Sequence, residues 1–312
     1  MRVLFASLAS PGHAFPLVPL AVAARAAGHE VHFAAGEEVH AALKARGLQV
    51  FRPADAFYEI YADDIAGDIE RLRPELIVHG WGVPGVAVAA DRAGIPSLWH
   101  GFGRLFPEGI GLARPGNDRP HVDVCPPSLQ DPDFVGSAER IPMRPVEAQP
   151  AAGSPIVYLT FGTAFGTAEL IRAAAEGVDR LGLPVVVAAG RVPPEELDDL
   201  PSRVTVLPWA PQDRLLARAA LVVHHGGSGT TLGALAAGVP QLVLPQGADQ
   251  FANAGALVAA GAALQLHDVT ADAVAELAHR LRAPEHRDAA RALADEIARM
   301  PAPDHVAREL AG

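Results

Sequence analysis

The stretch from Leu221 to Gly238 constrains the fold of this chain more than any other part of the sequence. It opens with an apolar β-branched run, Leu221–Val223, which is typical of a buried parallel strand. Glycines at 226, 227 and 229 follow, and a helix of small residues is predicted from Ser228. Because the free N–H groups and the dipole of a helix N-terminus favour negative charge, this order of elements predicts a diphosphate site.

The glycine pattern leaves the nucleotide unidentified. It is not a Walker A motif, since no Gly-Lys-Ser/Thr is present, and it is not G-x-G-x-x-G, since position 232 is Leu. The glycines alone leave one alternative open, a βα turn in which they serve only tight packing.

Composition excludes several classes of protein. The 312 residues, 50% hydrophobic and 20% charged, suit a soluble protein of two domains. A formal net charge of −11 argues against a nucleic-acid partner or an anionic membrane surface. The single cysteine, Cys125, excludes an internal disulfide and fits a reducing cytoplasm, where we expect the protein. No apolar run has the length of a transmembrane helix, so we expect no membrane partner.

The N-terminal half begins with a strand and a loop that carries a histidine. Arg2–Leu8 is predicted as a strand, 9–14 as a loop, and Phe15–Ala27 as a helix that Gly28 ends. Because ligands of open α/β sheets bind at the carboxyl ends of strands, His13 lies where a substrate would bind. A neutral imidazole is a good general base near pH 7, and a capping or packing histidine is the alternative.

The rest of the sequence alternates strands and helices in two series. The first series has predicted strands at Glu30–Ala34, Gln49–Phe51, Glu75–Val78 and Ile95–Trp99, and predicted helices at Ala56–Leu72 and Gly85–Ala93. The second has predicted strands at Ile156–Phe161, Pro184–Ala189, Val204–Leu207, Leu221–His224, Gln241–Pro245 and Ala262–Leu266. Two such series predict two facing, doubly wound parallel α/β domains with a cleft between them.

A proline-punctuated segment separates the two series. We predict a first domain over 1–140, a linker over 141–154 and a second domain over 155–299. A last helix, at about 300–312, is expected to pack back on the first domain.

Three further segments lie at strand ends of the second series. The Gly162–Thr163 turn can offer backbone N–H groups. Trp209 stands in a proline frame that suits stacking on a flat base, and a core tryptophan is the alternative. Asp249 and Gln250 suit a hydroxyl-rich ligand, because a carboxylate accepts from two hydroxyls. A helix N-cap at Asp249 is the competing interpretation.

These motifs together resemble a known family. Three segments of the chain, in this order and spacing, resemble the nucleotide-sugar signature of GT-B glycosyltransferases of family 1. They are Trp209–Gln212, His225–Thr230 and Asp249–Gln250. Ser7–Leu20 resembles the N-terminal catalytic loop of that family. Pro126–Gln130 and Met300–His305 resemble the bacterial branch that glycosylates antibiotics and other natural products. The resemblance covers both halves of the chain and implies the GT-B fold.

The resemblance implies a donor site in the second domain. Trp209 would stack on the pyrimidine, and the segment from Ala210 to Gln212 would read its edge. The diphosphate would be held by the glycine turn, the helix start and the Gly162–Thr163 turn, that is, by His225, Gly226, Gly227, Ser228, Gly229, Thr230, Gly162 and Thr163. Asp249 and Gln250 would bind sugar hydroxyls.

The resemblance also implies the reaction. His13 would deprotonate an acceptor hydroxyl, which displaces the nucleotide with inversion at the anomeric carbon. Acceptor contacts are implied for the aromatic residues near the strand ends, Phe15, His79, Trp81 and Phe102. Helix N–H groups and His225 would stabilise the leaving diphosphate without a metal, and no cofactor beyond the nucleotide sugar is expected. The only close Asp-x-Asp, Asp131–Asp133, lies among prolines and resembles a turn.

The sequence departs from the family pattern at three points. Plant-type members carry a ribose-binding Glu where this chain has Gly233, which favours a thymidine diphosphate (TDP) sugar over a UDP sugar. The Asp that often partners the base is missing from Val78–Trp81. The chain is short near 51–76 and 104–120, so we expect an acceptor site that is open, or completed by a partner or a second copy of the chain in a homodimer.

The leading hypothesis is therefore an inverting, metal-independent glycosyltransferase that uses a TDP-deoxysugar and a small hydrophobic acceptor. A catalytically silent nucleotide-sugar-binding protein is a second hypothesis, and another GT-B enzyme, such as a sugar-nucleotide epimerase, is a third. An NAD dehydrogenase is the weakest, because the dinucleotide pattern is absent.

Overall fold

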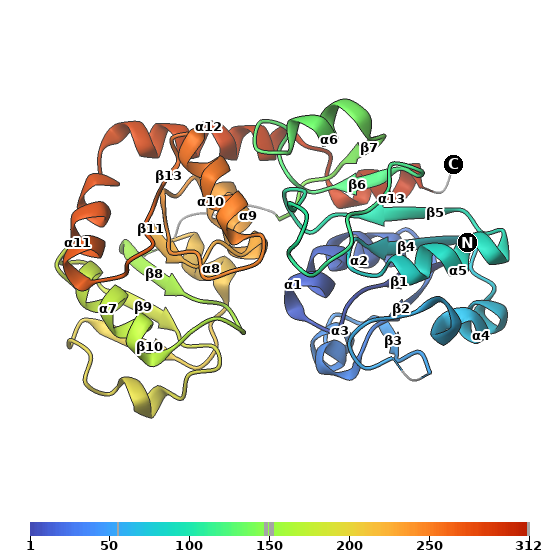
Figure 1. Cartoon of the computed structure of the whole chain (residues 1–312), viewed down its shortest axis with the longest axis horizontal. Helices are drawn as coiled ribbons and strands as arrows, with labels where there is room; N and C mark the ends of the chain where they lie inside the picture. The colour runs from blue at the N-terminus through green and yellow to red at the C-terminus, as the bar shows by residue number, and fades with distance from the viewer. Residues whose placement is uncertain (55, 147–148, 150–152, 311–312) are drawn as a thin grey trace. The chain divides into compact units, whose positions relative to one another are not determined.

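The computed structural model of the chain describes residues 1–54, 56–146, 149 and 153–310. The chain forms two compact units, Met1–Pro145 together with Met300–Gly312, and Val146–Arg299 (Figure 1). Among the described residues, no helix is both long and apolar enough to span a membrane.

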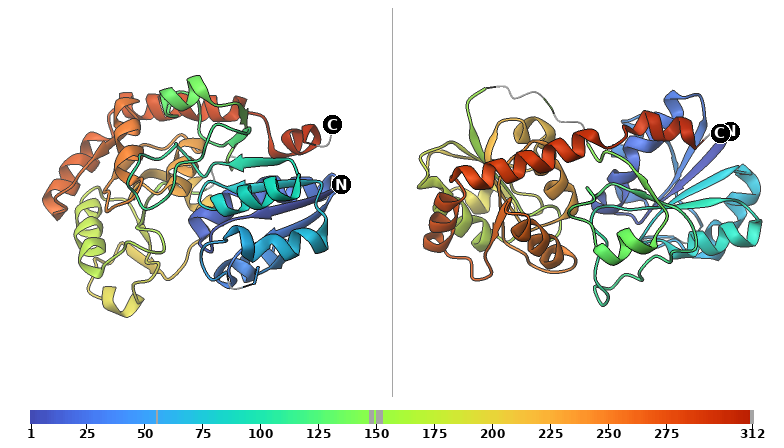
Figure 2. Two further views of the ribbon diagram at one scale, coloured as in Figure 1. Left: turned by 45° about the vertical axis from the view of Figure 1, so that its right-hand side comes forward. Right: turned by 90° about the horizontal axis from the view of Figure 1, so that it is seen from above.

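The first unit contains a seven-stranded parallel sheet of order β3-β2-β1-β4-β5-β6-β7. Its strands are β1 (Arg2–Ala6), β2 (Glu30–Ala34), β3 (Gln49–Phe51), β4 (Leu76–Gly80), β5 (Ser97–His100), β6 (His121–Asp123) and β7 (Arg140–Pro142). Its helices are α1 (Pro11–Ala14), η1 (Phe15–Leu17), α2 (Val18–Ala26), η2 (Glu37–Val39), α3 (His40–Lys44), α4 (Ala62–Leu72), α5 (Pro84–Ala93), α6 (Pro132–Ser137) and α13 (Pro303–Glu309). Helix α13, near the end of the chain, packs against α2 in this unit (Figure 2).

The second unit contains a six-stranded parallel sheet of order β10-β9-β8-β11-β12-β13. Its strands are β8 (Ile156–Thr160), β9 (Val185–Ala188), β10 (Val204–Leu207), β11 (Ala219–His224), β12 (Gln241–Val243) and β13 (Ala263–Gln265). Its helices are α7 (Ala168–Asp179), η3 (Pro194–Leu197), α8 (Gln212–Leu216), α9 (Ser228–Ala236), α10 (Gln250–Ala259), α11 (Ala271–Arg280) and α12 (Pro284–Arg299).

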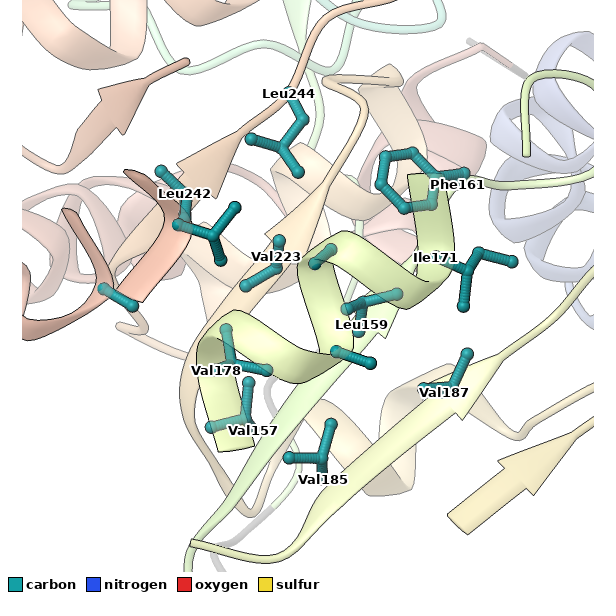
Figure 3. Close-up of a cluster of buried hydrophobic side chains, with 14 of the residues drawn as sticks. Val157, Leu159, Phe161, Ile171, Val178, Val185, Val187, Val223, Leu242 and Leu244 are labelled. Atoms are coloured by element: carbon teal, nitrogen blue, oxygen red, sulfur yellow. The ribbon is translucent and has the colours of Figure 1, made fainter. Parts of the chain in front are cut away.

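Alternating residues of the second sheet fill two apolar layers. Val157, Leu159 and Val223 point to one face, where they meet Ile171 and Val178 of α7 (Figure 3). The opposite face carries a second cluster, made of Ile156, Tyr158 and Val222 with residues of α8 and α9. Because a strand alternates its side chains between faces, near-continuous apolar strands need helices on both sides. The sheet is doubly wound for this reason.

Each sheet has a point at which the strand order reverses. In the first unit the reversal lies between β1 and β4, and in the second between β8 and β11. The crevice at the carboxyl ends of such a strand pair is where ligands of doubly wound sheets bind. The loops that follow these four strands therefore define the candidate site of each unit.

The predicted class of fold, parallel-sheet α/β in two units, is confirmed, but several boundaries differ. Helix α4 begins at Ala62 rather than at residue 56, because Ala56 and Ile60 are buried against Leu8 and Val83 instead of forming a helical turn. The predicted helix 15–27 is η1 followed by α2, and the predicted loop 9–14 contains the short helix α1. A proline stands in the first turn of each of these three elements.

The sequence analysis missed β6, α6 and β7, whose segments are short and rich in proline, and also the short helices α1, η2 and α3. Strand β7 occupies residues at the start of the predicted linker. Linker residues 147, 148 and 150–152 lie outside the described residues, as do 311 and 312 of the predicted last helix.

Candidate functional site

The glycine turn after β11 is built for close approach by an anion. Gly226 has φ +95°, a conformation that side-chain-bearing residues rarely adopt. Gly227 then forms the N-cap of α9, and no described side chain caps this helix. The first N–H groups of α9 are therefore available to a ligand, beside the hydroxyls of Ser228 and Thr230.

The ring of His225 fills the space between two glycines. An ideal Cβ on Gly162 would lie 2.9 Å from its Cε1, and one on Gly227 would lie 2.6 Å from its Nε2. The ring also stacks on Phe165 with centroids 5.7 Å apart. Burial lowers the pKa of His225 to about 4, so the imidazole is neutral at pH 7. The structure thus brings together the turn after β8 and the turn after β11.

The preceding histidine fixes the shape of the turn. His224 is fully buried, its Nε2 lies 2.7 Å from Oε1 of Gln241, and its Nδ1 accepts the N–H of Gly226 at 3.1 Å. Because Nδ1 accepts, the ring proton must be on Nε2, where it is donated to Gln241. Burial, and next the neighbouring His225, lower the pKa of His224 to about 3.

The predicted base-binding segment presents an exposed indole. Trp209 is 74% exposed, which rules out a core tryptophan. Ala210 behind it is buried. Gln212 opens α8, and its Oε1 accepts the hydroxyl of Thr230 at 3.0 Å. This hydrogen bond links the start of α8, which follows the Trp209 segment, to the start of α9.

Asp249 does not cap α10, although it stands at the N-cap position. Its Oδ2 accepts instead from Oγ of Ser228 at 3.1 Å and from Nδ2 of Asn253 at 2.9 Å. Burial raises the pKa of Asp249, and the hydrogen bonds from Asn253 and Ser228 oppose that shift. The carboxylate is therefore held at the start of α9, beside the predicted diphosphate position.

Gln250 has a local structural role. It is 2% exposed, and its Oε1 accepts the backbone N–H groups of Gln246 and Gly247 at 2.7 and 3.1 Å. This clamp closes the loop in which Ala248 has φ +54°, an unfavourable conformation for a residue with a Cβ. Thr163, the last member of the predicted donor set, is exposed in the turn after β8.

In the first unit, His13 lies in α1 after β1. Its ring meets Phe102 edge to face, with centroids 4.7 Å apart. Nδ1 is buried without a hydrogen-bond partner, and an ideal Cβ on Gly82 would lie 3.5 Å from it. Burial lowers the pKa of His13 to about 4. The other ring nitrogen, Nε2, is the one left to meet a substrate.

Two of the predicted acceptor contacts are buried completely. Trp81 and His79 are both 0% exposed. Trp81 donates its indole N–H to Nδ1 of His121 at 3.0 Å and packs edge to face on Phe102. His79 packs edge to face on Trp99 at 4.3 Å. Neither side chain reaches a surface, so we correct their predicted role from acceptor contact to packing beneath the His13 loop.

The other two predicted acceptor contacts differ in exposure. Phe102 is 6% exposed at the end of β5, against His13. Phe15 is half-buried, and the Arg46 guanidinium lies over its ring, 5.1 Å from the centroid. Acceptor contact stays a prediction for both.

Asp131, in the Asp-x-Asp pair, caps α6. Its carboxylate accepts the backbone N–H groups of Asp133 and Phe134, and it pairs with Arg104 at 3.2 Å. Across the described parts of the chain, no cluster of three or more His, Cys, Asp or Glu side chains is placed to hold a metal ion.

The sequence analysis missed residues that support the site rather than face a ligand. Asn253 is the clearest, and its signal was an isolated polar residue one helical turn after Asp249 on an apolar helix. The signal for His224 was its place in the His224–His225 doublet. Gly82 and Phe165 gave none, because their contacts involve segments distant in sequence.

The chain is similar in sequence to known proteins. Residues 173–312 match the family described as Erythromycin biosynthesis protein CIII-like, C-terminal domain. The chain is 33% identical to the L-demethylnoviosyl transferase of Streptomyces niveus over 375 aligned positions, which cover 100% of this chain and 98% of that protein. Since the chain has 312 residues, the relative has residues at alignment positions where this chain has none.

Solved structures show the same fold. The glycosyltransferase SsfS6 of Streptomyces sp. SF2575, complexed with thymidine diphosphate, is 27% identical with a TM-score of 0.80, over 100% of this chain and 99% of that one. The spinosyn rhamnosyltransferase SpnG, complexed with spinosyn aglycone, is 28% identical with a TM-score of 0.82, over 100% of both chains.

Fold and sequence similarity together define a GT-B glycosyltransferase. Within that class, the chain belongs to the bacterial glycosyltransferases of natural-product pathways.

Proposed function

We propose that this enzyme transfers a deoxysugar from a TDP-sugar to a hydroxyl of a small hydrophobic natural-product acceptor, with inversion and without a metal. The observation that carries the donor half is the uncapped N-terminus of α9, flanked by the neutral ring of His225 and the carboxylate of Asp249. A relative of the same fold is complexed with thymidine diphosphate and another with an aglycone, which supports both substrate classes.

In the proposed step, Nε2 of His13 takes the proton of the acceptor hydroxyl while that oxygen bonds to the anomeric carbon. The bond from that carbon to the diphosphate oxygen breaks, and TDP leaves with the electron pair. The first N–H groups of α9 and the hydroxyls of Ser228 and Thr230 stabilise the growing charge. These neutral donors support a metal-independent reaction.

Gly233 supports the thymidine preference. Its ideal Cβ would lie 2.7 Å from Cδ1 of Leu216 and 3.4 Å from Nε2 of Gln212. No carboxylate therefore stands beside Gln212 at this position to accept from the 2′-hydroxyl of a ribose. A deoxyribose has no 2′-hydroxyl, so it forgoes no hydrogen bond at this position.

Calorimetric titration with TDP, UDP and NADH tests the donor assignment. We expect TDP to bind more tightly than UDP, and NADH not to bind. Equal or tighter UDP binding would refute the thymidine preference and leave the donor site intact. Failure of both nucleotides to bind would refute the proposed function. Turnover of TDP-sugars with aromatic acceptors, with a β-configured product from an α-linked donor in the presence of EDTA, then tests inversion and metal independence.

A further inference from the structure

One polar side chain of α10 points into the interior without belonging to the predicted donor set. Asn253 is 5% exposed on a helix that is otherwise rich in alanine and large apolar residues. A buried amide is costly unless its hydrogen bonds are made. The contacts of Asn253 therefore indicate what it is there to hold.

The amide nitrogen of Asn253 reaches three parts of the donor site. Nδ2 lies 2.9 Å from the carbonyl oxygen of Gly226, 2.9 Å from Oδ2 of Asp249 and 3.3 Å from Oγ of Ser228. Gly226 belongs to the glycine turn after β11, Asp249 to the loop before α10, and Ser228 to the first turn of α9. With two protons, the amide donates fully to the two nearer oxygens and more weakly to the hydroxyl.

The bond to Gly226 completes the support of the glycine turn. His224 accepts the N–H of Gly226, and Asn253 donates to its carbonyl, so both polar groups of this peptide segment are fixed. A glycine with φ +95° has wide conformational freedom, and these two bonds limit it. The direction of the following helix N–H groups depends on that turn.

The bond to Asp249 matters most when a nucleotide is bound. In the described structure, the single hydroxyl proton of Ser228 is donated to Oδ2 of Asp249. If that proton turns to a phosphate oxygen, Asp249 keeps only Asn253 as a side-chain donor. Both of these side-chain bonds go to Oδ2, so Oδ1 is the oxygen that we assign to a sugar hydroxyl.

We propose that Asn253 is a positioning residue of the donor site. It fixes the Gly226 turn and Asp249 relative to each other, so that diphosphate and sugar hydroxyls are bound in one geometry. Asn253 touches neither group itself. This inference rests on the proposed function, because it assigns the partners of that same donor site.

Asn253→Ala and Asn253→Asp test the proposal by titration with TDP and TDP-glucose. We expect Asn253→Ala to weaken TDP-glucose by about tenfold or more, because a charged group loses a buried donor. TDP should weaken less, because it lacks the sugar hydroxyls that Asp249 is proposed to bind. The exposed Val258 on the same helix supplies a control, and Val258→Ala should leave both affinities unchanged.

Asn253→Asp separates positioning from general damage to the fold. The introduced carboxyl is nearly isosteric but places a second carboxylate beside Asp249, and two carboxylates this close share a proton as pH falls. The shared proton restores a donor, so affinity for TDP-glucose should be poor at pH 8 and recover by pH 5. Wild type is titrated beside it as the reference, because burial raises the pKa of Asp249 itself, and only a recovery beyond that of wild type reports the shared proton. Burial keeps His225 neutral above about pH 5, and TDP-glucose has no terminal phosphate to titrate. Asn253→Ala should not recover.

Four outcomes decide the case. Wild-type affinity in Asn253→Ala, or a uniform loss of TDP and TDP-glucose without pH recovery in Asn253→Asp, overturns the proposal. Failure of the wild type to bind TDP refutes the proposed function instead. Recovery of Asn253→Asp at low pH, with melting temperatures close to wild type, supports positioning.

Discussion

The two units place their candidate residues at the same topological point but support them in different ways. In the second unit, polar atoms bond to one another, as His224 does with Gln241 and Gly226, and Asp249 with Ser228. In the first unit, the corresponding loops are supported by aromatic packing. There His13 and His79 have buried ring nitrogens without hydrogen-bond partners, as Nδ1 of His225 does in the second unit, and their neighbours are Phe102 and Trp99.

The difference fits what each site is proposed to bind. A diphosphate needs donors held in fixed directions before it arrives, since reorienting them during the reaction costs free energy. A hydrophobic acceptor needs shape and a dry surface, which packed aromatic rings supply. The first unit therefore holds a weak base in an apolar setting, and the second holds a network of aligned donors.

The largest effect is expected for His13→Ala. Removing the proposed general base should lower kcat by about 100- to 10,000-fold, because positioned proton transfer contributes that much. TDP affinity should stay at the wild-type value, because the donor residues lie in the second unit. Steady-state rates and calorimetry on the same preparations measure both. Turnover retained within a few fold would show that another group is the base.

The second prediction applies one substitution to both units. His224→Leu should destabilise the protein by about 1–3 kcal/mol at pH 7.5, because the buried N–H of Gly226 and the Gln241 side chain lose their partner. His79→Leu removes a ring whose nitrogens have no partner, so it should be near neutral at that pH. Chemical denaturation measures both. Equal losses in the two variants would contradict the contrast between the units.

The same pair of variants carries a pH dependence. Burial, and next the Arg119 charge, lower the pKa of His79 to about 3, against 6.5 when the chain is unfolded. Between these values the unfolded state binds a proton that the folded state does not, so stability falls as pH drops below 6.5. His79→Leu removes that loss and should gain about 2 kcal/mol over wild type at pH 5. If the difference in stability between His79→Leu and wild type is the same at pH 7.5 and pH 5, the His79 ring is solvated in the folded protein.

The local geometry of the proposed donor site was easier to predict from the sequence than the packing around His13, for a physical reason. His225, Ser228 and Thr230 lie within one strand–turn–helix stretch, where local spacing fixes their geometry. Trp209 was ambiguous only because propensity cannot tell an exposed indole from a core one. Whether Trp81 and His79 are buried depends on which side chains of β5, β6 and α6 pack over β4. Two of those elements, β6 and α6, were missed.

The smallest effect is expected from a substitution that gives Nδ1 of His13 a hydrogen-bond partner. Burial lowers the pKa of His13 to about 4, which makes the ring a weak base, and Nδ1 has no hydrogen-bond partner that would oppose this shift. An ideal Cβ on Gly82 would lie 3.5 Å from that atom, so Gly82→Asp places a carboxylate within reach. The carboxylate stabilises the imidazolium and should raise the pKa of His13 by about one unit or more. The acid limb of kcat/KM should move to higher pH, and kcat at pH 8 should rise, because a base works best with a pKa near the working pH.

Gly82→Asn is the matched control for this substitution. Either new side chain would bring its Cβ to 2.5 Å from Cδ1 and 2.9 Å from Cγ of the buried Leu8, so Leu8 must shift in both variants. Only the aspartate adds charge, and any difference between the two pH profiles therefore reports electrostatics at His13 rather than repacking. If the two profiles coincide, the unpartnered Nδ1 does not limit the base, and the first unit depends on aromatic packing alone to orient its histidine.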